Sequence, residues 1–199
     1  MAISLWAARI ERELSRSEEH ALELLLPESR RERLARAQKP EKRREVLCAY
    51  TMLYMALREQ YGWKKIPEMA VTSMGKPHFP DFPTVHFNIS HTAGAALVGL
   101  SDEAVGVDIE RIRPISMRSM QRIAGVASQE AFFQSWVRRE ARAKRAGTGI
   151  RTLQERESPL QKGEHFYYLE TFDGYVAGVA TRSEDPPGKV RRYFLDELL

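Results

Sequence analysis

Two carboxylates stand two residues apart in the run VGVDIE, at Asp108 and Glu110. If this run is a strand, its side chains alternate, so both carboxylates project from one face and repel each other. A hard divalent cation relieves such repulsion, and Mg²⁺ typically takes one or two carboxylates together with substrate phosphates and water. For this run alone, a strand with one solvated acidic face is the simpler interpretation.

A third carboxylate, Glu140, falls in a predicted helix over 128–147. Glu140 and Lys144 share one helical stripe with two aromatic residues, Phe132 and Trp136, because all four are spaced by four. As a surface ion pair, Glu140 and Lys144 would contribute only roughly 0.2–0.5 kcal/mol. We prefer a ligand-binding interpretation, in which this carboxylate and the two of VGVDIE complete a metal–phosphate site.

The run FNISHT places Ser90, His91 and Thr92 at the end of a predicted apolar strand. Hydroxyl and backbone N–H groups can donate to phosphate oxygens, and a protonated imidazole adds positive charge. The small residues that follow leave room for a ligand. A structural histidine and a Ser/His hydrolase are the alternatives, and the hydrolase is the weaker because no G-x-S-x-G run surrounds Ser90.

The net charge is +4, and the basic excess is concentrated in one segment. Between residues 29 and 44, only Glu32 and Glu41 oppose eight basic residues: Arg30, Arg31, Arg33, Arg36, Lys39, Lys42, Arg43 and Arg44. Such a cluster predicts an anionic partner, although a charge run alone is more often a solvated helix face. Nucleic acid is the least favoured partner, because no nucleic-acid motif is present and no aromatic residues interleave the run.

The remaining elements have to position these side chains. We expect helices over 17–37, broken at Pro27, over 41–62 and over 128–147. Strands are predicted near 68–73, 85–90, 93–100 and 104–110, and 164–182 reads as a hairpin with Asp-Gly at its turn. We also expect 93–100 and 104–110 to form a hairpin. Each half then has helices followed by antiparallel strands, which indicates an α+β fold divided into 1–102 and 103–199.

Composition limits the class of protein. The 199 residues are 43% hydrophobic and 29% charged, as in ordinary globular proteins, and no apolar run is long enough to cross a bilayer. The one cysteine, Cys48, cannot form an intramolecular disulfide, and the first apolar run turns charged at Arg9 before it could form a secretory h-region. We therefore expect a cytoplasmic protein without a membrane partner.

The order of these runs resembles the 4′-phosphopantetheinyl transferase family, in its larger single-chain class. The resemblance rests on GKPHFPDFPTVHFNISHTAGAALVGLSDEAVGVDIERIRPIS and on WVRREARAK, which is similar to the family's second signature of Trp, two residues, Lys-Glu, three residues and Lys. LPESRRER and the final RRYFLDELL extend it over most of the chain. The combination of these runs is highly specific.

The resemblance implies a monomer built as a pseudo-dimer of two similar α+β halves, with the active site in the cleft between them. It implies transfer of the 4′-phosphopantetheine arm of coenzyme A to a serine of an acyl or peptidyl carrier protein, with release of adenosine 3′,5′-bisphosphate. The implied cofactor is Mg²⁺, with Mn²⁺ left open. Carrier proteins present an acidic helix beside the target serine, which suits the basic excess of this chain.

The resemblance also implies roles for individual residues. Asp108, Glu110 and Glu140 bind the metal ion, and Glu140 takes the serine proton, directly or through a metal-bound water. Lys144 contacts the phosphates and helps to neutralise the leaving group. The implied coenzyme A contacts are Ser90 and His91 for its phosphates, and Lys76 (in the run GKP), Arg44 and one or both of Arg30 and Arg31 for its 3′-phosphate and adenine end.

Two departures from the family pattern stand out. Arg139 occupies the position before Glu140 where the family usually has Lys, and the two are not interchangeable at a shaped site. The segment between Ile115 and Trp136 is short and leaves room for little more than one helix and a turn, whereas in the family this region meets the carrier protein. A degenerate relative that binds coenzyme A or a carrier protein without transfer is therefore the alternative.

Overall fold

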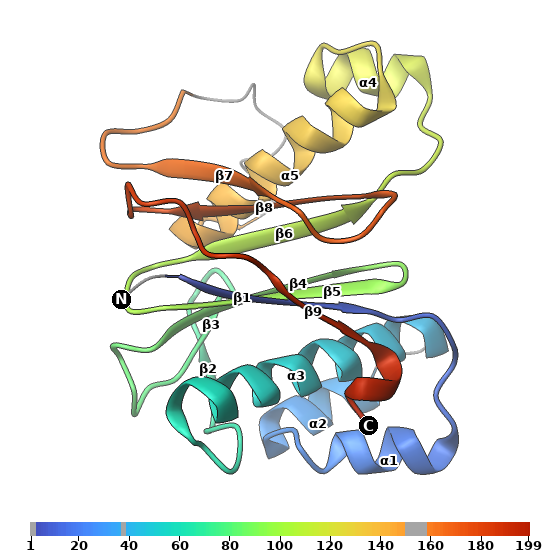
Figure 1. Ribbon diagram of the computed structural model, residues 1–199, viewed down its shortest axis with the longest axis vertical. Coiled ribbons are helices and arrows are strands. Elements are labelled where there is room, and N and C mark those ends of the chain that lie inside the picture. The colour runs from blue at the N-terminus through green and yellow to red at the C-terminus, as the bar shows by residue number, and fades with distance from the viewer. Residues whose placement is uncertain (1–2, 37–38, 150–158) are drawn as a thin grey trace.

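The computed structural model describes residues 3–36, 39–149 and 159–199. These residues form four layers, with two β-sheets packed on each other and helices on both outer sides (Figure 1). On one side lie α1 (Arg16–Glu23), α2 (Glu28–Ala35) and α3 (Pro40–Tyr61). On the other side lie α4 (Met117–Ala124) and α5 (Gln129–Ala146).

The first sheet has the strand order β4-β5-β1-β9. It contains β1 (Ser4–Arg9), β4 (His86–Thr92), β5 (Ala95–Ser101) and β9 (Arg191–Phe194). The first three pair antiparallel, whereas β9 runs parallel to β1. The sequence interpretation missed β1, because its residues from Leu5 to Ala8 are buried on both faces and show no alternation.

The second sheet has the order β6-β8-β7 and is antiparallel throughout. Its strands are β6 (Gly106–Arg111), β7 (His165–Leu169) and β8 (Tyr175–Thr181). The predicted hairpin over 164–182 is confirmed, with Gly174 at φ 79° in its turn. The predicted hairpin of 93–100 with 104–110 is wrong, because β5 pairs with β4 and β1 while β6 pairs with β8, so the intervening residues connect the two sheets.

The two sheets share one order of connection. Each begins with a strand, continues through helices, and ends in a hairpin whose second strand pairs antiparallel with the first strand. The small β2 (Ala70–Val71) and β3 (Pro77–His78) pair beside the first sheet, and a 3₁₀ helix, Leu195–Glu197, follows β9. The predicted α+β class is confirmed, whereas the division at residue 102 stays a prediction.

The two long helices end where glycine allows it. Gly62 follows α3 at φ 69° and Gly147 follows α5 at φ 70°, a left-handed conformation that only glycine adopts without strain. At its start, α5 is capped by Ser128, whose side chain accepts a hydrogen bond from the N–H of Ala131. These signals explain why the helices predicted at 41–62 and 128–147 are confirmed almost to the residue.

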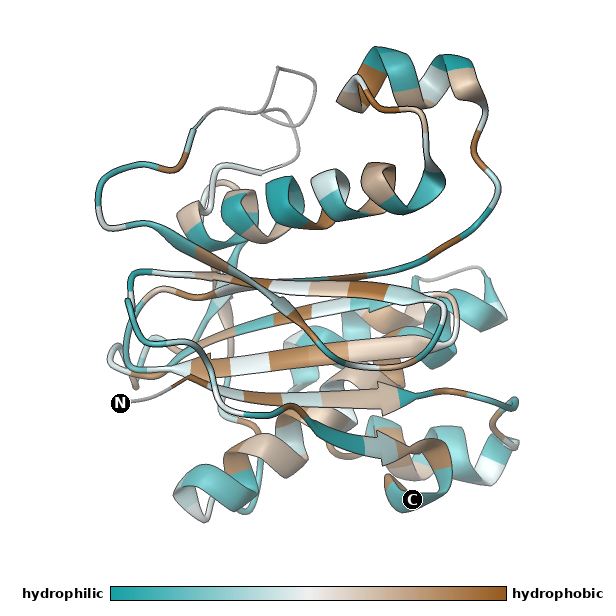
Figure 2. Ribbon diagram, turned by 45° about the horizontal axis from the view of Figure 1, so that its top comes forward, coloured by the Kyte–Doolittle hydropathy of each residue, from teal (hydrophilic) through white to brown (hydrophobic). Residues whose placement is uncertain are grey.

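Apolar clusters pack the described elements together. One lies between α3 and the first sheet, around Trp6, Leu53 and Phe87. A second, with Leu97 and Val107, fills the space between the sheets. Figure 2 accordingly shows hydrophobic residues along the central strands, whereas much of the outer helical surface is hydrophilic. In the part of the chain that the structure describes, no helix is both long and apolar enough to cross a membrane.

A third cluster, Met120, Phe132 and Phe133, joins α4 to α5, and Trp136 packs against it. The Trp136 and Phe132 rings stack with centroids 6.1 Å apart. We expect Trp136→Ala to lower the free energy of unfolding by about 2 kcal/mol, because the indole is only partly buried. Thermal denaturation would show this as a fall in Tm of roughly 4–8 °C. Tyr168→Ala, at a half-exposed position, is the control, and equal Tm values for the two variants would contradict the assignment.

Candidate active site

Side chains, rather than a backbone ladder, connect the facing edges of the two sheets. β4 and β6 are edge strands, and alternate residues of β4 point at β6. We call Asn88, Ser90 and Thr92 the side-chain ladder. Its contacts with β6 are Asn88 Oδ1 accepting from Val107 N at 2.8 Å, Ser90 Oγ accepting from Ile109 N at 3.3 Å, and Thr92 Oγ1 donating to Glu110 Oε2 at 3.2 Å.

Asp108 stands at the centre of this junction and is buried. Its Oδ1 accepts from Ser90 Oγ at 2.7 Å and from Lys144 Nζ at 2.6 Å, and Lys144 Nζ also lies 3.0 Å from Ser90 Oγ. The favourable pairing of Lys144 with Glu140 is thus not formed, because the ammonium reaches across to β6. The second oxygen of Asp108, Oδ2, is buried without a hydrogen-bond partner among the described residues.

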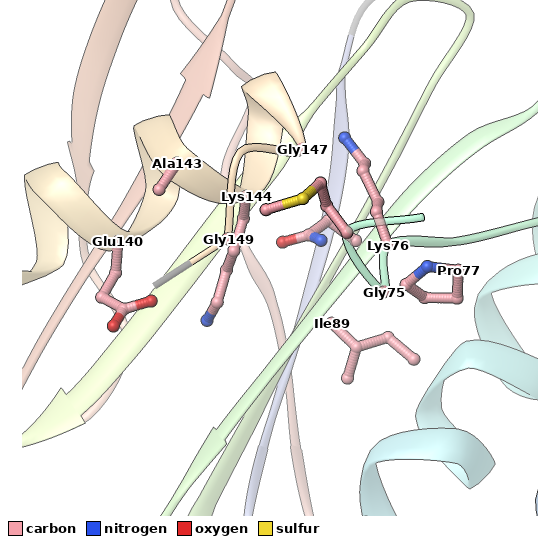
Figure 3. Close-up of a pocket in the computed structure, with 11 residues that line it drawn as sticks. Gly75, Lys76, Pro77, Ile89, Glu140, Ala143, Lys144, Gly147 and Gly149 are labelled. Atoms are coloured by element: carbon pink, nitrogen blue, oxygen red, sulfur yellow. The ribbon is translucent and has the colours of Figure 1, made fainter. Parts of the chain in front are cut away.

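Glu140 lies on α5 one turn before Lys144, and both side chains extend to the side of the helix that faces the strands (Figure 3). Within the described part of the chain, its carboxylate makes no hydrogen bond. Burial raises the pKa of Glu140; Lys144 opposes this rise, whereas the charges of Asp108 and Glu110 add to it. The carboxylates of Asp108 and Glu110 are therefore close enough to Glu140 for their charges to act on it.

Glu110 has two cationic or polar neighbours. Besides Thr92, Arg113 donates from Nη1 to Glu110 Oε2 at 2.8 Å, and its guanidinium lies 5.0 Å from the centre of the Phe133 ring. The sequence interpretation missed Arg113, although its i, i+3 spacing from Glu110 was a possible signal. Among the residues described, no three His, Cys, Asp or Glu side chains form a ready metal cage. Even so, the carboxylate oxygens present suit a hard cation. Asp108 Oδ2 has no hydrogen-bond partner among the described residues, and the neighbouring charges of Asp108 and Glu110 help to raise the pKa of Glu140, a repulsion that a cation would relieve.

Two adjoining cavities open beside this cluster. The reaction cavity, of about 240 Å³, lies under α5 and contains Glu140 and Lys144 in its lining (Figure 3). The basic cavity, of about 470 Å³, lies between α2, α3 and β4. Four residues line both cavities: Gly75, Pro77, Asn88 and Ile89. A ligand could therefore extend from one cavity into the other.

Some of the residues predicted to bind coenzyme A lie in the basic cavity. Arg30 is buried in its wall, and its Nε has no hydrogen-bond partner in the described structure. His91 lines the same cavity, with Nδ1 3.2 Å from Glu45 Oε2, a partner that the sequence did not indicate. Lys42 of the basic segment lines it as well. The basic cavity therefore combines three groups that can carry positive charge.

The other predicted contacts lie elsewhere. Arg31 is exposed, and Arg44 lies 3.9 Å from Glu13; neither lines the reaction cavity or the basic cavity. Lys76 lines the reaction cavity, but its Nζ donates to the carbonyls of Val105 at 3.2 Å and Arg145 at 2.9 Å. Burial and the nearby Arg145 charge lower the pKa of Lys76 to about 8. In this arrangement Lys76 connects the loop that contains residues 75–77 to the last turn of α5.

Interactions on the far side of α5 hold the helix in place. Glu164, which is buried, accepts from Arg142 Nη2 at 2.9 Å and from Arg145 Nη2 at 3.3 Å. Arg139, the residue that departs from the family pattern, is buried and donates to the carbonyl of Ile123 at 3.1 Å, which connects α5 to α4. The sequence could not reveal these contacts, because their partners lie far apart along the chain.

Comparison with known proteins supports one family. No family profile matches the chain. The 4′-phosphopantetheinyl transferase ffp of Bacillus subtilis is 23% identical over 99% of this chain and 100% of its own length. The 4′-phosphopantetheinyl transferase Sfp of Bacillus subtilis strain 168 is 22% identical over 99% of this chain and 100% of its own length. The 4′-phosphopantetheinyl transferase AcpT of Salmonella typhi is 36% identical over 41% of this chain and 50% of its own. Two of these three 4′-phosphopantetheinyl transferases are thus similar to the chain over 99% of its length, at 22% and 23% identity.

Proposed function

We propose that this protein transfers the 4′-phosphopantetheine arm of coenzyme A to a serine of an acyl or peptidyl carrier protein. The observation that carries the proposal is the contact of Asp108, Ser90 and Lys144 between the two sheets, beside two joined cavities. One cavity is basic and the other contains a carboxylate and an ammonium group. This arrangement suits a substrate with an anionic nucleotide at one end and a reacting diphosphate in the middle.

In the proposed reaction, the serine oxygen forms a bond to the phosphorus that bears the pantetheine. The bond between that phosphorus and the oxygen of the adenosine 5′-phosphate breaks, so adenosine 3′,5′-bisphosphate leaves. Glu140 accepts the serine proton, a role that its raised pKa supports because proton transfer is most efficient when the pKa lies near the working pH. Lys144 neutralises charge on the phosphates. His91 orients them by a hydrogen bond, and Ser90 would join it only if its hydroxyl released Asp108.

The metal ion of the proposal is Mg²⁺, with Mn²⁺ open, and Asp108, Glu110 and Glu140 would hold it. When bound, it would neutralise the diphosphate and stabilise the leaving group. Thr92 and Arg113 orient Glu110, and Ser90 orients Asp108, so two of the three carboxylates are held before any ligand binds. Such preorganisation is what electrostatic stabilisation of a transition state requires.

The nucleotide end of coenzyme A is assigned to the basic cavity, with Arg30 at its 3′-phosphate and adenine end and His91 on its phosphates. Arg31, Arg44 and Lys76 would join them only after their side chains move, because they lie outside the basic cavity or are bound to carbonyl groups. The carrier protein would approach the exposed basic residues near Glu110 and α4, where Arg113 and Arg118 suit an acidic helix.

The repeated order of strand, helices and hairpin supports a pseudo-dimer of residues 1–102 and 103–199, with the active site between its halves. A monomer follows from this arrangement, because both sides of the site come from one chain. We retain the cytoplasm as the proposed location on the evidence of the single cysteine. The alternative of a degenerate binder without transfer is not favoured, since Asp108, Glu110, Glu140 and Lys144 are all present.

Intact-mass spectrometry of carrier proteins tests the proposal. An apo acyl carrier protein and an apo peptidyl carrier domain are each incubated with this protein, coenzyme A and Mg²⁺. We expect a gain of one phosphopantetheine arm that EDTA abolishes. If neither carrier gained mass while calorimetry still showed coenzyme A binding, the result would contradict the proposal. It would support a degenerate binder whose short segment before Trp136 does not accept a carrier protein.

The raised pKa of Glu140 predicts that its ionised carboxylate, which the proposed reaction needs, lowers the stability of the folded protein. The folded state holds the Glu140 proton more tightly than the unfolded state does, so ionisation lowers the free energy of unfolding as pH rises above 4.5 and through the folded pKa. Glu140→Gln removes that loss. We expect it to raise Tm at pH 7–8 in EDTA, with a smaller difference below pH 4.5, and to lower kcat by about 10²–10⁴-fold. Glu170→Gln, at an exposed position, serves as the control, and superimposable Tm profiles for wild type and Glu140→Gln would contradict the prediction.

A further inference from the structure

Asn88 is the only asparagine in the sequence, and it is buried in β4 with 5% of its surface exposed. Its side-chain carbonyl oxygen accepts from the backbone N–H of Val107 at 2.8 Å. Because β4 and β6 belong to different sheets, this bond takes the place of a backbone ladder bond between them. Asn88 thus fixes the position of the residue directly before Asp108.

The same bond determines which way the amide faces. Val107 offers an N–H group, which only the oxygen of the amide can accept, so the Nδ2 group must point in the other direction. In the described structure Nδ2 donates to no protein group, and it is not among the fully enclosed atoms that lack a partner. Asn88 lines both the reaction cavity and the basic cavity. Nδ2 therefore presents its two N–H groups at the wall that the cavities share.

We infer that Nδ2 of Asn88 donates a hydrogen bond to the diphosphate of bound coenzyme A, an inference that rests on the proposed function. With the nucleotide beside Arg30 and His91, and the transferred group beside Glu140 and Lys144, the diphosphate is the part of coenzyme A that crosses the shared wall. A neutral donor suits this place, because it binds an anionic oxygen without adding a charge that must be desolvated.

The consequence is that one side chain couples the substrate to the carboxylate cluster. The carbonyl oxygen of Asn88 holds β6 at Val107, next to Asp108, while its nitrogen holds the diphosphate. Asn88 is in this sense a positioning residue for Asp108 and a binding residue for the substrate. Because the amide is rigid, displacement of β6 would also displace the donor.

Nuclear magnetic resonance can observe this group directly. A protein labelled with ¹⁵N only at asparagine side chains gives a single NH₂ pair of signals, because the sequence contains one asparagine. Coenzyme A is added with Mg²⁺ and without a carrier protein, and calorimetry measures its affinity under the same conditions. We expect both NH₂ signals to shift and to saturate with the calorimetric Kd. Unchanged signals while calorimetry reports binding would overturn the inference alone, whereas absence of coenzyme A binding would overturn the proposed function with it.

Variants provide a second test. Asn88→Asp keeps an oxygen that can accept from Val107 but replaces the donor with an anionic oxygen that repels phosphate. We expect its affinity for coenzyme A to fall at least about tenfold. The matched control is Thr51→Val, which removes a buried hydrogen bond to the Leu47 carbonyl outside both cavities and should change the affinity less than about twofold. Undiminished affinity in a folded Asn88→Asp protein would refute the donor role. If that variant does not fold, the NH₂ signals of the labelled wild-type protein test the donor role by themselves.

Discussion

Replacing Asp108 with asparagine or alanine is expected to abolish transfer, with kcat/KM reduced at least about 10³-fold. Such a loss corresponds to about 4 kcal/mol of transition-state stabilisation. Asp108 is buried, contacts Ser90 and Lys144, and its Oδ2 has no hydrogen-bond partner among the described residues, so we expect the proposed metal site to depend on its charge. The measurement is the mass gain of an apo carrier protein at a series of Mg²⁺ concentrations.

The asparagine variant separates charge from packing. It preserves an acceptor for Ser90 and Lys144, so we expect a folded protein whose Tm in EDTA stays within a few degrees of wild type. Asp173→Asn, in the exposed turn between β7 and β8, should leave transfer unchanged. Transfer within tenfold of wild type by Asp108→Asn would remove Asp108 from the metal site.

The second large effect is expected at Gly106, the first residue of β6. A Cβ atom at this position would lie 2.1 Å from the carbonyl oxygen of Ala141 and 2.3 Å from the nitrogen of Arg145. Both are backbone atoms of α5, so no side-chain rotation can relieve the contact. Gly106→Ala should therefore force α5 away from β6, at a cost of about 3 kcal/mol or more. For a chain of this size, that lowers Tm by roughly 6–12 °C.

This substitution should also remove activity from the protein that remains folded. The two clashing residues directly follow Glu140 and Lys144 in sequence, so the catalytic side chains move with the displaced helix. Gly188→Ala provides the control, because nothing lies within 4 Å of a Cβ there and its backbone angles suit any residue. Wild-type Tm and transfer in Gly106→Ala would show that the close approach of α5 to β6 is unimportant.

Local signals in the sequence were sufficient for much of the secondary structure. The spacing by four of Phe132, Trp136, Glu140 and Lys144 indicated α5, and Asp-Gly at 173–174 indicated the β7–β8 hairpin. Pairing between strands was less accessible, because it depends on partners distant in sequence. Two apolar runs separated by a short polar link, at 93–100 and 104–110, looked like a hairpin, yet each strand pairs within a different sheet.

For the candidate active site too, the sequence revealed the reactive residues but not their contacts. Residue types and spacing indicated which side chains carry chemistry, because carboxylates, hydroxyls and cations are recognisable without a fold. Their partners were not recognisable: Lys144 pairs with Asp108 across the sheets rather than with Glu140 along the helix. Asn88 carried no signal either, since its importance depends on an edge strand of another sheet. The assignments to the metal ion and to coenzyme A remain predictions that await the experiments above.

The position of β9 has a consequence for how this protein is made. β9 extends the first sheet by pairing with β1, and Leu195 and Leu198 beyond it belong to the cluster that covers α3. A ribosome synthesises roughly 5–20 residues per second. The strand β4, which carries Asn88 and Ser90, therefore emerges several seconds before its sheet can be completed. During that interval one edge of β1 lacks its strand partner, and an unpaired strand edge is a place where another chain can pair.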